Sequence, residues 1–159
     1  MKKLKVFRFA LAALVLASAF VSSACGPEKV KAVAGAIYAA SGGFEQEFVE
    51  AARRGDISAA DGARLSAWTR EVGSSARTLS ITAEGWKEKT DAQKRAAILQ
   101  FVSEVAEAQN RLDAQGAPVF KSEKARRRFA DVQLYLSRAV TALRIVEAAL
   151  PASKSSPPQ

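Results

Sequence analysis

The chain has 159 residues, with 24 basic and 16 acidic side chains, one cysteine and no histidine. The absence of histidine removes the commonest general base and the commonest ligand of catalytic metals, and one thiol makes neither an internal disulfide nor a Cys-rich zinc site. Four of the basic residues precede position 9, so the rest of the chain has 20 basic and 16 acidic residues. This mild excess does not favour nucleic acid as a partner. We therefore expect no cofactor, no metal site and no catalytic residue.

Residues 1–24 are typical of a cleavable signal peptide. Four basic residues lead into an apolar run over residues 9–20, and small residues follow at positions 22–24. A basic segment, an apolar core and a small-residue cleavage site, in this order, predict export across a membrane.

The five residues Val21-Ser22-Ser23-Ala24-Cys25 resemble the lipobox of bacterial lipoproteins. The resemblance implies that the signal is cut before Cys25, that Cys25 carries acyl chains such as palmitate, and that the protein is anchored in the cell envelope. That family prefers Leu three positions before the cysteine, where this chain has Ser22. Gly26 stands where inner-membrane retention in many Gram-negative bacteria is associated with aspartate, so the resemblance implies the outer membrane, facing the periplasm. It covers residues 1–26 only.

Two other fates of the first segment stay open. Ser22-Ser23-Ala24 also suits ordinary signal peptidase, which would leave a secreted domain with a free thiol. An uncleaved membrane anchor is the other alternative, although Ser18, Ser22 and Gly26 make a poor last third for a spanning helix.

Residues 25–150 are predicted to form one all-α domain, an up-and-down bundle of about four helices, followed by a disordered tail over residues 151–159 that is rich in Pro and Ser. Pro27 suits the first turn of a helix. An apolar stripe at three- and four-residue spacing follows, made by Val30, Val33, Ala34, Ile37 and Tyr38. We expect Ser41-Gly42-Gly43 to kink or break this segment, which is either one kinked helix or two short ones before Gly55.

The second and third segments begin at hydroxyl residues that suit N-caps. Ser58 with Asp61 resembles a capping box, and Thr90 with Gln93 matches one. The second segment has the seam Leu65, Trp68, Val72, Leu79 and Trp86, with a bend or fraying expected near Gly73. The third has the seam Ile98, Phe101, Val105, Ala108 and Leu112, up to a loop at residues 115–118.

Ser122 is expected to cap the last segment, which keeps a heptad rhythm until Pro151. Its seam is Phe129, Val132, Leu136, Ala139, Leu143, Val146 and Leu150. Such a seam predicts packing against near-antiparallel neighbours, which favours a four-helix bundle. Leu134, Val140 and Ile145 lie off the seam, so this helix is either central or buries a second face in an oligomer.

The basic run at the start of the last helix is a candidate contact for an anion or a membrane. Its residues Lys121, Lys124, Arg127 and Arg128 surround a helix N-terminus, where the backbone already favours negative charge, while Arg126 points elsewhere. The alternative interpretation is a solvated face.

Aromatic and acidic residues are interpreted as structural. Trp68 and Trp86 fit the core, and so do Tyr38 and Tyr135, although Tyr135 lies beside the heptad seam and is available for a second contact or a partner. Five glutamates at helical spacing are expected to be solvated, because carboxylate di-metal bundles also require histidine: Glu45, Glu47, Glu50, Glu104 and Glu107.

The predicted function is a non-enzymatic, lipid-anchored envelope protein that acts as a binding or assembly module for an unidentified envelope partner. Because only Gly26 separates Cys25 from the first helix, Lys29 and Lys31 are expected to face lipid head groups. The alternative is a periplasmic carrier that opens at Gly42-Gly43 and Gly73 to admit a small apolar or anionic ligand. Hydrolase activity would need a polar cleft with a perturbed serine or carboxylate.

Overall fold

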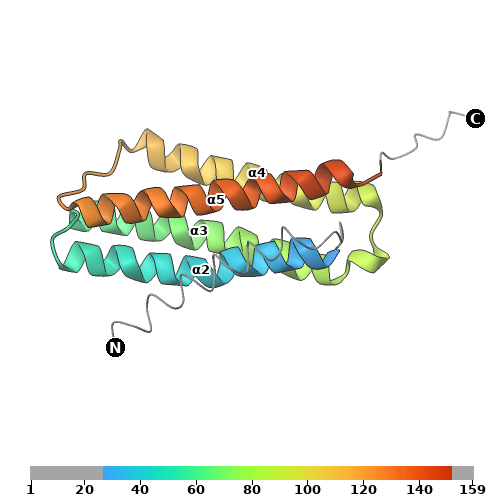
Figure 1. Cartoon of the computed structure of the whole chain (residues 1–159). Helices are drawn as coiled ribbons and strands as arrows, with labels where there is room; N and C mark the ends of the chain where they lie inside the picture. The colour runs from blue at the N-terminus through green and yellow to red at the C-terminus, as the bar shows by residue number, and fades with distance from the viewer. Residues whose placement is uncertain (1–26, 152–159) are drawn as a thin grey trace, which may run out of the picture.

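The computed structural model describes residues 27–151, which form four long helices and one short 3-10 turn (Figure 1). The helices are α2 (Pro27–Arg53), α3 (Ala59–Glu84), α4 (Asp91–Ala114) and α5 (Glu123–Ala149), and the turn η1 (Trp86–Glu88) lies between α3 and α4. Consecutive helices run in opposite directions, and each packs against two neighbours, so that α3 lies diagonally across from α5. The predicted all-α, up-and-down bundle is confirmed.

Three helices begin at the predicted residues, because a hydroxyl side chain caps each first turn. Ser58, Thr90 and Ser122 each accept a hydrogen bond from the backbone N–H three residues later. At Thr90 the bond is reciprocated, since its own N–H donates to Gln93 Oε1 at 2.9 Å. The capping box predicted there is confirmed.

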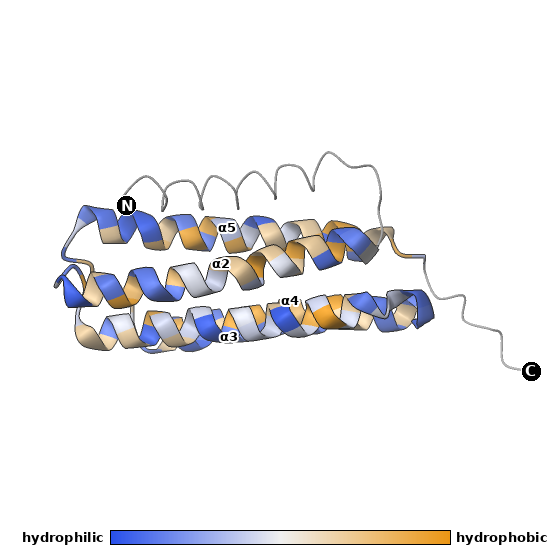
Figure 2. Ribbon diagram, turned by 90° about the horizontal axis from the view of Figure 1, so that it is seen from below, coloured by the Kyte–Doolittle hydropathy of each residue, from blue (hydrophilic) through white to orange (hydrophobic). Residues whose placement is uncertain are grey.

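The core runs the length of the bundle and contains both tryptophans, with Trp68 4% and Trp86 1% exposed. The predicted seam of α5 is also correct, and its fully buried members are Val132, Leu136, Ala139, Leu143 and Val146. Each large apolar side chain buried in this way contributes about 1.5–3 kcal/mol to the free energy of unfolding. Figure 2 shows how hydrophobic residues, which supply the core, alternate with hydrophilic residues along each helix.

Of the two alternatives for the first segment, α2 is one helix through Gly42-Gly43 and not two short ones, and α3 runs through Gly73 without the fraying expected there. Gly73 is buried and marks a close approach of the two helices. A Cβ atom there would lie 2.9 Å from Cβ of Ser41 and closer still to its hydroxyl. Packing therefore explains this glycine, and it outweighs the low helix propensity that suggested a break.

Two aromatic predictions need correction. Trp86 does not continue the seam of α3, which ends at Glu84; η1 turns its side chain back into the core. Tyr38 is 48% exposed, and the guanidinium of Arg77 lies 5.8 Å from its ring centroid. The phenol can keep its hydroxyl in water at this edge of the α2 stripe, so hydrophobic spacing alone overestimated its burial.

The predicted signal peptide, the predicted lipidation site Cys25 and residues 152–159 of the predicted tail lie outside the described residues. Within 27–151, none of the helices contains a stretch long and apolar enough to cross a membrane.

Candidate functional site

The four predicted contact residues Lys121, Lys124, Arg127 and Arg128 come together at one end of the bundle, which we call the Ser122 end. It is built from the turn between α2 and α3 and the loop between α4 and α5 (Figure 1). The opposite end, the Pro27 end, holds the start of α2, η1 and the last turn of α5. The 27 residues of α5 separate the two ends by about 40 Å.

The arginines of this cluster are already engaged by carboxylates. Arg127 Nε lies 3.0 Å from an oxygen of Glu123, which Arg126 also contacts. The hydrogen bond from Arg127, followed by that from Arg126, lowers the pKa of Glu123 below its usual value. Arg128 lies 3.9 Å from Glu47 of α2. These guanidiniums are partly neutralised, which weakens them as an anion site.

The lysines are different, because Lys121 and Lys124 are exposed and have no ion pair within 4.0 Å among residues 27–151. The carboxylate of Asp56 lies near Lys124. The largest cause that lowers the pKa of Asp56 is a hydrogen bond from Arg54. A hydrogen bond from Ser122 and the charge of Lys124 lower this pKa further. Of the four predicted contact residues, the two lysines are therefore the ones that no carboxylate of residues 27–151 pairs within 4.0 Å.

A short backbone bridge, which the sequence did not predict, holds the two loops of the Ser122 end together. Ile57 and Phe120 form an isolated antiparallel bridge, and the backbone N–H of Lys121 donates to the carbonyl of Asp56 at 2.7 Å. Phe120 also stacks against Phe129 of α5, with ring centroids 5.4 Å apart. The position of Lys121 is therefore fixed by backbone contacts.

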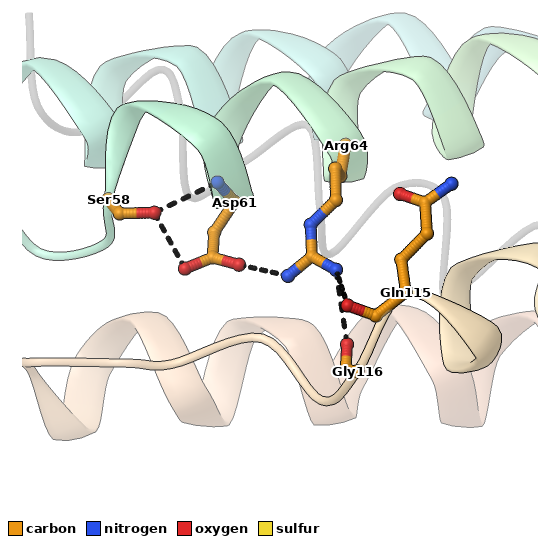
Figure 3. A network of polar contacts seen from close by, with 5 residues as sticks. All are labelled: Ser58, Asp61, Arg64, Gln115 and Gly116. Atoms are coloured by element: carbon orange, nitrogen blue, oxygen red, sulfur yellow. Dashed lines mark hydrogen bonds and ion pairs between the residues drawn. The ribbon is translucent and has the colours of Figure 1, made fainter.

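A polar clasp ties α3 to the same loop (Figure 3). Ser58 donates its hydroxyl to Asp61 at 2.7 Å, and Asp61 pairs with Arg64 one turn later. Arg64 in turn donates to the carbonyls of Gln115 and Gly116, at 2.6 and 3.2 Å. Asp61 is only 6% exposed, so its negative charge is stabilised by the donors Ser58 and Arg64 in place of water.

We expect the clasp to make the free energy of unfolding decrease as the pH falls into the acid range. The Arg64 hydrogen bond is the largest cause that holds the pKa of Asp61 below its ordinary 3.8, so the folded state binds the proton more weakly than the unfolded chain. The stabilisation is present above pH 3.8 and is lost as pH falls through the folded pKa. Asp61→Asn should lower the free energy of unfolding by about 1–3 kcal/mol at pH 7, measured by urea denaturation.

Asp131→Asn is the matched control, since this exposed carboxylate meets only Arg128, at 3.8 Å. Its effect should be under about 0.5 kcal/mol. Equal losses in the two variants, or an unchanged acid dependence in Asp61→Asn, would show that the clasp does not stabilise the fold.

Tyr135 is not available for a surface partner, contrary to one of the two roles allowed for it. Its ring packs edge-on against Phe44 of α2, with centroids 5.7 Å apart. Burial raises the pKa of its phenol to about 12. The second contact of Tyr135 is therefore α2 itself.

Two shallow grooves lie on the surface, and neither enters the core. One groove lies between α3 and α4, and its lining is polar. It includes Glu104 and Glu107, which were expected to be solvated, and Arg111, which forms ion pairs with Glu71 and Glu107. The other, between α2 and α3, is lined mainly by small residues such as Gly62 and Ala63, together with Arg53 and Arg70. Among the described residues, no three His, Cys, Asp or Glu side chains are grouped as a metal site would require.

The fold places the chain among up-and-down four-helix bundles, with a mixed-charge cluster at one end and no deep cleft in the described part. No family model, curated protein or solved structure matches it.

Proposed function

We propose that this protein is a non-enzymatic lipoprotein of the bacterial cell envelope, held in the membrane by an acylated Cys25 and acting through its helical bundle as a binding or assembly module. The observation that carries the proposal is the position of the bundle. α2 begins at Pro27, two residues after the lipobox-like segment, and residues 27–151 then form one closed domain. Such a domain needs no further partner to bury its core and is suited to presenting surfaces at a membrane.

The chemistry of the Pro27 end supports a position near lipid head groups. Lys31 is exposed, and its ammonium lies 3.2 Å from the exposed carboxylate of Glu84, a pair that water and salt screen strongly. Lys87 of η1 is also exposed at this end. Basic side chains beside an acyl anchor add attraction to anionic lipids.

The carrier alternative was motivated by the glycine breaks and by the wide apolar surface of the last helix, and it loses the first of these. It required the bundle to open at Gly42-Gly43 and Gly73, but both helices are continuous, and Gly73 packs against Ser41. We do not propose it.

Fractionation of cells of the native host tests the proposal. We expect the protein to sediment with outer membranes, to resist extraction by high salt and alkaline carbonate, and to dissolve in nonionic detergent, because acyl chains hold it by the hydrophobic effect. Release by salt alone would indicate a peripheral protein, and recovery in the soluble periplasm would indicate a secreted domain; either result would defeat the proposal.

A further inference from the structure

The outward face of α5 carries a stripe of exposed residues at three- and four-residue spacing. We call it the outer stripe; it comprises Arg127, Ala130, Leu134, Arg138, Thr141, Ile145 and Ala148. Leu134 is 51% and Ile145 50% exposed, although the opposite face of the same helix is buried in the core. The helix is therefore apolar on its inner face and mixes apolar with cationic side chains on its outer face.

The charge of α5 distinguishes it from its neighbour α4. α5 contains six basic and three acidic residues, whereas α4 contains three basic and four acidic residues. Arg138 and Arg144 lie within 4.0 Å of no carboxylate among residues 27–151. The exposed lysines Lys121 and Lys124 extend this positive charge to the Ser122 end.

The positively charged helix α5 ends at the same end of the bundle as the expected lipid anchor. α2 and α5 are neighbours, and α2 begins at the end of the bundle where α5 finishes (Figures 1 and 2). Cys25 precedes Pro27 by two residues, so an anchor there is tied to the end of the bundle where α5 finishes. A bundle standing upright on the membrane would hold Lys121 and Lys124 about 40 Å above it. A bundle lying on α5 brings the anchored end and both lysines to one surface.

We propose that the outer stripe of α5 docks on the anionic lipid surface of the membrane in which Cys25 is anchored, so that the bundle lies along the bilayer. This inference rests on the proposed lipid anchor. The guanidinium of Arg138 in the stripe and that of Arg144, which is exposed next to Thr141 and Ala148 of the stripe, pair with lipid phosphates. Leu134 and Ile145 enter the boundary between head groups and acyl chains. The outward face of α3, with Ile81, is then left toward the aqueous phase, while Lys31 and Lys87 stay at the anchored Pro27 end.

Spin labels on single introduced cysteines test this orientation, because acylation blocks Cys25, the only native thiol. The full acylated chain carries Leu134→Cys, Ile145→Cys or Ile81→Cys and is reconstituted in vesicles that contain phosphatidylglycerol. Ile81 is the matched control: it is 58% exposed, lies on α3 diagonally across from α5, and is also near the Pro27 end. Collision of each label with a water-soluble nickel chelate is measured by electron paramagnetic resonance.

We expect the labels at positions 134 and 145 to be shielded several-fold relative to position 81, and Arg138→Glu with Arg144→Glu to restore access at position 134. Equal access at all three positions would overturn the docking, and so would shielding accompanied by dipolar broadening, which would place a second copy on the stripe. Intact mass of the same sample separates the two proposals, since a chain without acyl groups defeats the anchor itself.

Discussion

Gly73→Ala should lower the free energy of unfolding by about 1–3 kcal/mol, although alanine is the better helix former. The added methyl would lie 2.9 Å from Cβ of Ser41 and closer to its hydroxyl, so α2 and α3 must move apart. Both residues are buried, and although the Ser41 hydroxyl can rotate, its Cβ is fixed to the backbone of α2, so rotation does not relieve the 2.9 Å contact. Urea denaturation at neutral pH measures the loss.

Gly43→Ala is the matched control, because this glycine lies inside α2, is exposed and would have no atom within 4 Å of the new Cβ. It should stabilise the protein by about 1 kcal/mol. Ser41→Gly combined with Gly73→Ala should recover part of the lost stability, which makes the pair non-additive. Equal stabilisation by Gly73→Ala and Gly43→Ala would refute the close approach.

Local patterns predicted the helices well, because caps and heptads depend on residues close in sequence. Thr90 with Gln93 fixes the start of α4, and the seam from Val132 to Val146 fixes the inner face of α5. Gly73 was misinterpreted for the opposite reason, since its role depends on Ser41, 32 positions away, and helix propensity contains no information about that contact.

The candidate site was only partly predictable. The basic run is visible in the sequence, but its partial neutralisation by Glu47 depends on how α2 packs against α5. The clasp from Asp61 through Arg64 to the carbonyl of Gln115 also joins residues 51 positions apart in sequence. The sequence signal that existed, Ser58 three residues before Asp61, indicated only a helix cap.

Cys25→Ser should abolish incorporation of an alkyne analogue of palmitate by cells of the native host. A serine hydroxyl is not the acylated group of the lipobox family, so the loss should be complete, and the signal should remain attached or be cut by ordinary signal peptidase. Click labelling after immunoprecipitation measures it. Each acyl chain supplies about 0.8 kcal/mol per buried CH₂, so the variant loses most of its affinity for the membrane.

Ser22→Leu serves as the control for that experiment, because it restores the residue that the lipobox family prefers three positions before the cysteine. Labelling should persist in this variant. Label retained in Cys25→Ser would place acylation elsewhere, and the proposed anchor would then be wrong.

The most direct test of the lipid anchor is the intact mass of the mature protein extracted from its native membrane. We expect a polypeptide that begins at Cys25 and carries a diacylglycerol group and an additional acyl chain. An unmodified polypeptide that begins near Cys25, or one that retains residues 1–24, would contradict the proposed lipoprotein.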